Sequence, residues 1–276
     1  MKKRTSIVLV FLLPFMFGFG KCGEEALTSS EALQSLEEVV LSTQMTVLTS
    51  GSVEIATNFT IGQAAQAAAE ELGIFIETQM PCAEITLVDA TLTIEYGVNP
   101  GNCEYNGQEY SGSHSITVVS ASVGNLVVDH EWEDLSNGRI SVTGDATVTW
   151  SSEDSSRNVV HELVWTRIID GKVTTGGGDR TQTVLNGSLF NGFTSDGNRY
   201  WNSDRGDWDL DIDNVEIRWE DPVPQAGTYT LDTPFDKSAS LSFERLDDDT
   251  IEVTIASGEE EFSFEVSKLG TVSDSD

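Results

Sequence analysis

The sequence predicts a mainly β fold, a large antiparallel meander with an N-terminal pair of α-helices packed on it. Apolar and polar residues alternate along Arg139–Trp150, with Gly144 as the single gap, which is typical of a strand with one buried face. Variants of this pattern continue from Ala83 to the end of the chain, separated by Asx-Gly pairs that favour hairpin turns. On the order of a dozen strands result, too many for one flat sheet. We therefore expect a curled sheet, a sandwich or a barrel.

Residues 1–21 have the features of a bacterial signal peptide. Lys2, Lys3 and Arg4 precede an apolar run from Ile7 to Phe19 that is too short for a comfortable membrane-spanning helix. The sequence therefore predicts export.

Cys22 follows the leader directly, in the context Gly20-Lys21-Cys22-Gly23. This context resembles the processing site of bacterial lipoproteins, in which the cysteine becomes the lipidated first residue. Phe19 and Lys21 depart from the usual residues at their positions, so ordinary cleavage after Gly20 is the alternative. The expected partner is the membrane, reached through the lipid anchor, and the expected location is the cell envelope, as an outer-membrane lipoprotein on either face.

The chain has three cysteines, and lipidation of Cys22 leaves Cys82 and Cys103 as a pair. A two-residue turn at Asp89-Ala90 would place Cys82 opposite Gly97 in a hairpin. The turn-forming residues that follow Gly97 can then bring Cys103 back beside Cys82. We expect a disulfide between these two cysteines.

Residues 22–81 are expected to hold the lipid tether and the helical pair. The first helix begins with a capping box at Thr28–Glu31 and ends at Ser50-Gly51-Ser52; the second begins with a similar box at Thr60–Gln63. Both carry an apolar stripe, so we expect them to pack on the sheet. The alternative is a helical plug or lid over a cavity.

The meander is expected to span residues 82–221. Its predicted turns are Asn106-Gly107, Asn137-Gly138, Asp170-Gly171, Asn186-Gly187, Asp196-Gly197 and Asp213-Asn214. The last turn would pair Trp208 with Trp219 and give both strands one apolar face. The proline-containing segment Glu220–Gly227 is expected to be a stiff loop. Residues 222–276 add further strands that continue the main β domain.

The formal net charge is −31, from 46 acidic and 15 basic residues. Such a charge repels nucleic acid, so the sequence excludes a nucleic-acid partner. Solubility alone is a sufficient reason for the charge, although it also favours cations and basic partners.

Four aspartates alternate with apolar residues along one predicted strand. Asp207, Asp209, Asp211 and Asp213, with Glu220, approach the spacing of a calcium-binding loop, and Asp204 is a further candidate ligand. The alternation also fits the solvent-exposed face of an amphipathic strand. Calcium is the only cofactor that the sequence suggests.

Tyr200-Trp201 is the candidate ligand-binding pair, because aromatic side chains on a sheet can form a platform for a sugar or an apolar ligand. Core filling is the alternative for the tryptophans. His114, His130 and His161 lack metal-ligand spacing, and no catalytic or phosphate-binding motif occurs. We therefore do not expect an enzyme.

The leader with Cys22-Gly23, the capped helices, Cys82 and Cys103 and the Asx-Gly hairpins together resemble uncharacterised lipoproteins of environmental Gram-negative bacteria. That group has no assigned activity, so the resemblance implies a location in the cell envelope and no biochemical activity. The expected function is a non-catalytic binding or structural role in the envelope. The alternatives are a carrier of an apolar ligand between sheet and helices, and a glycan-active enzyme with a carboxylate pair.

Overall fold

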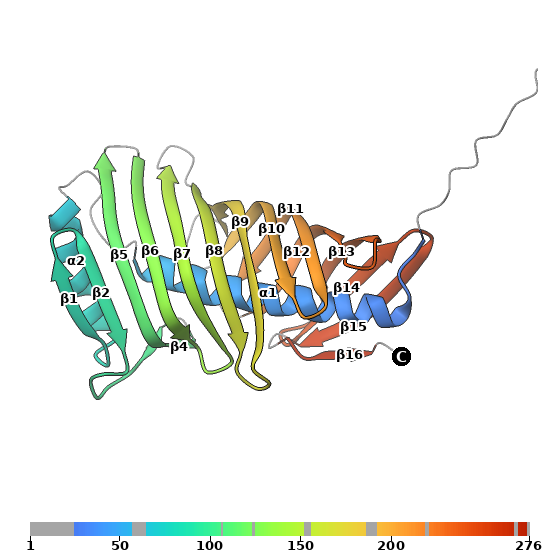
Figure 1. Cartoon of the computed structure of the whole chain (residues 1–276), viewed down its shortest axis with the longest axis horizontal. Coiled ribbons are helices and arrows are strands. Elements are labelled where there is room, and N and C mark those ends of the chain that lie inside the picture. The colour runs from blue at the N-terminus through green and yellow to red at the C-terminus, as the bar shows by residue number, and fades with distance from the viewer. Residues whose placement is uncertain are drawn as a thin grey trace, which may run out of the picture.

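The computed structural model describes residues 25–56, 65–105, 107–122, 125–151, 156–185, 192–218, 221–267 and 270–274. Fourteen strands form one antiparallel sheet, in which each strand lies beside its neighbour in sequence (Figure 1). Of the three architectures that the sequence left open, the curled sheet is observed. Within the described part of the chain its edges are β1 and β16, and β3 and β4 form a separate two-stranded hairpin.

The helices are α1 (Ser29–Ile55) and α2 (Ala65–Gln79). The strands are β1 (Glu84–Val88), β2 (Thr91–Tyr96), β3 (Glu104–Tyr105), β4 (Gln108–Glu109), β5 (Ser111–Ser122), β6 (Asn125–Ser136), β7 (Ile140–Ser151), β8 (Ser156–Arg167), β9 (Lys172–Val184), β10 (Phe193–Ser203), β11 (Gly206–Arg218), β12 (Asp221–Asp232), β13 (Ser238–Arg245), β14 (Thr250–Ser257), β15 (Glu260–Ser267) and β16 (Val272–Asp274).

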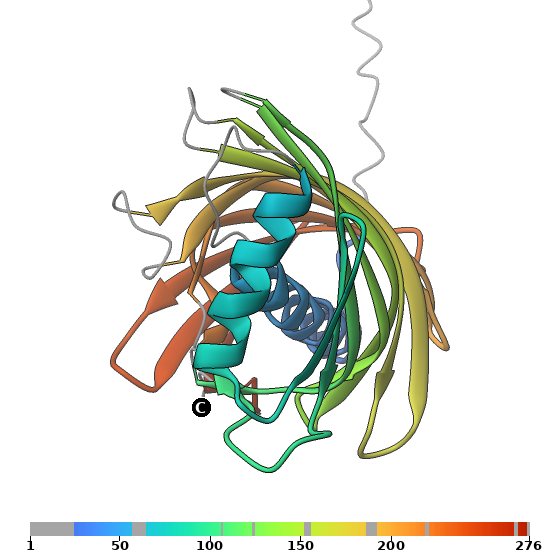
Figure 2. The same cartoon turned by 90° about the vertical axis from the view of Figure 1, so that its left-hand side faces the viewer.

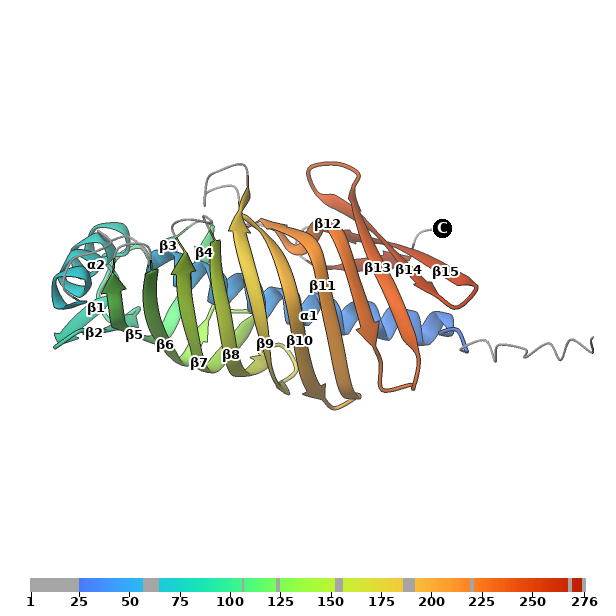
Figure 3. The same cartoon turned by 90° about the horizontal axis from the view of Figure 1, so that it is seen from above.

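Helix α1 lies inside the curl of the sheet. The strands bend around it in the end-on view (Figure 2), and they cross over it in sequence order when the molecule is seen from above (Figure 3). The helix is buried along almost its whole length, including hydroxyl-bearing residues such as Ser42 and Thr46. Helix α2 packs against β1, β2 and β5 at one end of the sheet. The predicted packing of the helices on the sheet is confirmed.

The capping box at the start of α1 is confirmed. The Thr28 side chain accepts from Glu31 N at 3.3 Å, and the Glu31 carboxylate accepts from Thr28 N at 2.7 Å. The predicted end at Ser50-Gly51-Ser52 is wrong, because α1 continues to Ile55. Gly51 serves close packing: a Cβ there would lie 2.6 Å from Tyr110 Oη. The box predicted at Thr60–Gln63 lies outside the described residues.

The β1–β2 hairpin forms as predicted, with Ile85 opposite Ile94 and Leu87 opposite Leu92. Asp89, in its turn, has φ of 55°, which short polar side chains tolerate. Glycines with positive φ also occupy the β3–β4, β6–β7 and β8–β9 turns, at Gly107, Gly138 and Gly171. Asn186-Gly187 lies outside the described residues.

Two predicted hairpin turns are wrong. Asp196-Gly197 lies within β10 and Asp213-Asn214 within β11, and both strands continue through them with a shift of register. Trp208 consequently pairs with Trp201 on β10, and Trp219 lies outside the described residues. A β-bulge adds one residue to a strand, so the apolar parity changes there as it would across a two-residue turn.

The segment expected to be a loop forms most of β12, so the loop prediction is wrong from Asp221 onward. Its pairing with β11 is irregular, because Arg218 pairs with Asp221 and Glu216 with Ala226. Prolines are tolerated in strands where the hydrogen-bond ladder is interrupted in this way. The sheet thereby passes without a break into the C-terminal strands.

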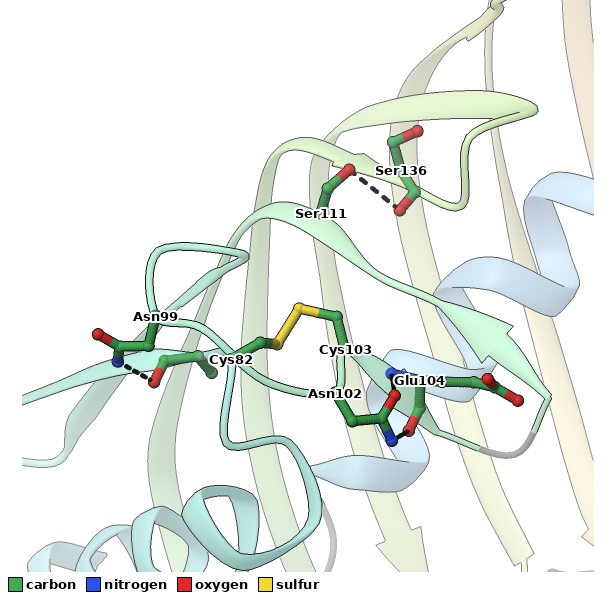
Figure 4. Close-up of a disulfide and its surroundings, with 8 residues drawn as sticks. Cys82, Asn99, Asn102, Cys103, Glu104, Ser111 and Ser136 are labelled. Atoms are coloured by element: carbon green, nitrogen blue, oxygen red, sulfur yellow. Dashed lines mark hydrogen bonds between the residues drawn. A yellow bond between two sulfur atoms is a disulfide. The ribbon is translucent and has the colours of Figure 1, made fainter.

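The predicted disulfide joins Cys82 and Cys103, whose Cα atoms are 5.4 Å apart (Figure 4). Asn99 N donates to the carbonyl oxygen of Cys82 at 2.9 Å, which holds the intervening loop against the start of β1. A structural disulfide fits an exported protein. In the part of the chain that the structure describes, no helix has the length and apolar character needed to span a membrane. The leader and Cys22 lie outside that part.

Candidate functional site

The outer face of the sheet, which points away from α1, carries a row of acidic side chains. Strand alternation places alternate residues on this face, and cross-strand register aligns them. The aligned residues are Glu131, Asp145, Glu162, Gly177, Tyr200, Asp209 and Asp232. Five carboxylates therefore share one row, interrupted by a glycine and a tyrosine.

A groove of about 740 Å³ lies where the row is interrupted, and we name it the outer groove. Its lining includes Glu162, Val164, Tyr200, Asn202, Asp209 and Asp232. This volume is within the range of small-molecule sites. The outer groove therefore combines apolar surface with carboxylate and amide oxygens.

Gly177 lies beneath the contact between Glu162 and Tyr200, two residues of the outer groove, and we call it the glycine floor. A Cβ at this position would lie 2.6 Å from Glu162 Oε1 and 2.7 Å from Tyr200 Oη. The Tyr200 hydroxyl donates a hydrogen bond to Glu162 across the glycine, and this bond raises the pKa of Tyr200. The Tyr200 side chain is 45% exposed, so its ring is held in place and still faces solvent.

Other groove carboxylates also have neutral hydrogen-bond partners. Asn202 Nδ2 donates to Asp207 Oδ1 at 2.6 Å, and Ser238 Oγ donates to Asp232 Oδ1 at 2.5 Å. A carboxylate accepts several hydrogen bonds, so these groups can still accept from a ligand.

The candidate pair Tyr200-Trp201 is divided between the two faces of β10. Tyr200 lies in the outer groove, whereas the Trp201 side chain is buried and its Nε1 donates to Glu38 Oε2 at 3.2 Å. The Trp201 indole stacks on Trp208, with 6.0 Å between ring centroids. Trp201 therefore contributes to the core between the sheet and α1.

The candidate calcium ligands on β11 share the outer face. Asp207 and Asp209 line the outer groove, and Asp211 and Asp213 follow along the strand with exposed side chains. Among the residues that the structure describes, no three acidic, histidine or cysteine side chains form a group that could hold a metal ion. Glu220 lies outside those residues.

No protein family, curated protein or solved structure matches the chain.

Sequence reasoning missed three residues of the row around Tyr200, which are Glu162, Gly177 and Asp232. They come from β8, β9 and β12, and only the register of the sheet brings them together. The sequence does carry a signal for the glycine at position 177. Gly176-Gly177-Gly178 interrupts an alternating strand, and glycine within a strand often marks a place where another group approaches the backbone closely.

Proposed function

We propose that this chain is an exported, lipid-anchored envelope protein that binds a glycan, without catalysis, in the outer groove. One observation carries the proposal: the half-exposed ring of Tyr200 is fixed by Glu162 over a glycine floor, beside Asn202 and Asp209. A pocket with apolar surface and a few oriented polar groups is the usual form of a ligand site.

The chemistry of the outer groove suits a polyhydroxylated ligand. The apolar face of a sugar ring can pack on the Tyr200 ring, as other apolar surfaces pack on aromatic side chains. Its hydroxyl groups can donate to the carboxylates of Asp209 and Asp232, which accept only. The surrounding acidic row would repel an anionic glycan. The ligand class is therefore a neutral or amine-bearing oligosaccharide.

The proposed location in the cell envelope is supported by the leader, by Cys22 and by the disulfide, which fits an oxidising compartment. The expected membrane partner is reached through Cys22. Leu27 N donates to Ser257 Oγ at 3.1 Å, so the described chain begins beside β14, at the opposite end of the sheet from α2. The lipid would attach near that end and leave the outer face open.

The carrier alternative is less well supported. Helix α1 fills the inside of the curl, and the cavity between α1 and the inner face beside Trp132 and Arg157 is about 10 Å³, the size of one water molecule. An apolar ligand inside the curl would require α1 to leave its place in the core. A groove of about 930 Å³ does lie between α1 and the rim of the sheet, but its lining mixes Val40, Leu41 and Ile168 with charged side chains such as Arg139 and Arg205.

Calorimetric titration of the purified full chain with neutral, amine-bearing and anionic oligosaccharides tests the proposal. We expect a neutral or amine-bearing glycan to bind, and Tyr200→Ala to weaken binding about tenfold or more, because the aromatic contact is lost. Val160→Ala is the matched control, since Val160 is exposed on β8 and is not among the residues that line the outer groove. Equal affinity in both variants, or no binding by any glycan, would contradict the proposal.

The same samples test the absence of catalysis. We expect the bound glycan to be recovered intact by chromatography after long incubation. Shortened products that disappear in Glu162→Gln would instead support the glycan-active alternative, in which two facing carboxylates cleave the sugar.

A further inference from the structure

The inner face of the sheet carries three buried arginines. Arg157, Arg180 and Arg199 are 2%, 2% and 1% exposed. Arginine is almost never fully buried unless it is paired, so each guanidinium requires an account of what balances its charge.

The register of β8, β9 and β10 brings these arginines together. Arg180 lies opposite Val159, and therefore diagonally between Arg157 and His161 on β8. Arg199 lies opposite Gly178, whose missing side chain leaves room for the His161 ring. Three positive charges thus share one region of the core, under the middle and the C-terminal half of α1.

The partners of Arg180 and Arg199 in the described structure are neutral. Arg199 donates to Thr46 Oγ1 at 2.7 Å, to the Ser42 carbonyl oxygen at 3.0 Å and to Tyr229 Oη at 3.0 Å. Arg180 Nη1 donates to the same Thr46 hydroxyl at 3.0 Å. These bonds orient the guanidinium groups and leave their charge uncompensated.

Arg157 is balanced only in part. Its Nε donates to Gln182 Oε1 at 2.7 Å, and its guanidinium lies 5.1 Å from the centroid of the Trp150 ring. Burial lowers the pKa of Arg157 to about 10, and the charge of Glu54 opposes that shift. Glu54 also hydrogen-bonds Tyr105, so among the described residues a single, shared carboxylate opposes the charge of three buried arginines.

A small cavity lies at the centre of this charge. It measures about 10 Å³, and Arg157, His161, Arg180, Ser50 and Trp132 are among the residues that line it. In the described part of the chain, three donors of the two lining arginines have no hydrogen-bond partner: Arg157 Nη1, Arg157 Nη2 and Arg180 Nε. Arg199 Nε, on the arginine that does not line the cavity, also has none. One side of the cavity therefore presents positive charge and unused donors, and apolar side chains such as Val53, Ala146 and Leu163 close the rest of it.

We propose that a single monatomic anion, chloride under physiological conditions, binds in this cavity between Arg157, Arg180 and His161. An anion accepts from several donors at once and balances the buried charge, whereas a water molecule adds two hydrogens that need acceptors of their own. The cavity volume of about 10 Å³ has room for a single small particle, and it excludes phosphate, sulfate and carboxylates.

Thermal unfolding of the purified full chain tests the proposal. The midpoint is measured in sodium chloride and in sodium gluconate at equal ionic strength, over a range of chloride concentrations. Chloride that binds only the folded state should raise the midpoint saturably, by about 5 °C at a hundred times its Kd. A midpoint that depends on ionic strength alone, equally in both salts, would overturn the proposal.

Two variants locate the effect. Arg180→Met removes a charge that lines the cavity and should abolish the chloride shift. Arg199→Met removes a charge that is not among the residues lining the cavity, and it should keep the shift. Loss of the shift in both variants, or in neither, would contradict the assigned site.

Crystals of the wild-type chain grown in sodium bromide give a second measurement, which does not depend on the folding of a variant. We expect an anomalous peak between Arg157 and Arg180. Bromide peaks confined to the protein surface, with water in the cavity, would overturn the proposal.

Discussion

Lys172 and Glu38 form an ion pair between the start of β9 and the buried helix α1, with 2.5 Å between Lys172 Nζ and Glu38 Oε1. The Glu38 side chain is 2% exposed, and it also accepts from Trp201 Nε1. Arg205 Nη1 lies 3.7 Å from the same carboxylate. The N-terminal half of α1 is thus held in the curl by a buried charge cluster as well as by apolar packing.

Breaking this pair should be costly. Lys172→Met leaves the Glu38 carboxylate buried with weaker compensation, so we expect the free energy of unfolding in urea to fall by about 3 kcal/mol. Arg167→Met is the control, because Arg167 and Asp170 form an exposed pair whose loss should cost about 1 kcal/mol or less. Equal losses in the two variants would show that Glu38 does not depend on Lys172.

The cap of α1 should make the protein sensitive to acid. The hydrogen bond from Lys237 Nζ, at 2.8 Å, and the backbone N–H of Thr28 lower the pKa of Glu31 to about 2. Glu31 therefore contributes stability above its ordinary pKa of about 4.5, and this contribution is lost as the pH falls from about 4.5 to about 2.

Urea unfolding across this pH range checks the cap. The midpoint of Glu31→Gln should fall less steeply on acidification than that of the wild type. Glu70→Gln, at an exposed position of α2, should follow the wild-type curve. Identical curves for all three proteins would contradict a role for Glu31.

The disulfide should matter most at the α2 end of the sheet. Cys82 and Cys103 are 21 positions apart, and opening a loop of this size costs about 3 kcal/mol in the loop-entropy model. Cys82→Ser combined with Cys103→Ser should lower the free energy of unfolding by that amount. Thiol counting on the unfolded, unreduced wild type should find neither Cys82 nor Cys103 free, and finding both of them free would refute the pairing.

The contact between Tyr200 and Glu162 should be visible in a tyrosine titration. Because Glu162 raises the pKa of Tyr200, Glu162→Gln should move that titration to lower pH, toward 10. Phenolate absorbance follows the change, and Tyr200→Phe identifies which step belongs to Tyr200. A titration unchanged by Glu162→Gln would mean that the two groups do not interact in solution.

Residue patterns predicted which face of each strand is buried better than they predicted where the strands turn. Asp213-Asn214 has the residues and the parity change of a hairpin, yet β11 continues through it with Asn214 at φ of 51°. Asp196 Oδ1 accepts from Asn214 N at 2.7 Å, so the bulges of β10 and β11 support each other. This contact joins two strands and cannot be inferred from either segment alone.

Of the candidate site, the sequence pointed to Tyr200 as a ligand-binding residue and to Asp207 and Asp209 as metal ligands, and the rest of the outer groove depends on register. The burial of Arg157 could have been predicted from the sequence. Arg157 and His161 share the parity of Val159 and Leu163, which marks them as core residues of β8. Charged residues at buried positions contradict the usual alternation, and such exceptions often mark sites.

The hydrogen bond from Leu27 N to Ser257 Oγ joins residues 230 positions apart. The two ends of the chain must therefore both be present before this contact can form. Helix α1 is made near the beginning of the chain, but part of its surface can be covered only after the last strands have formed. Folding should therefore be slow, because few of the contacts that bury the helix are local. Until the C-terminal strands have been made, the apolar surface of the helix stays uncovered. Chains that stop before β13 should consequently be recognised by chaperones and proteases as incomplete.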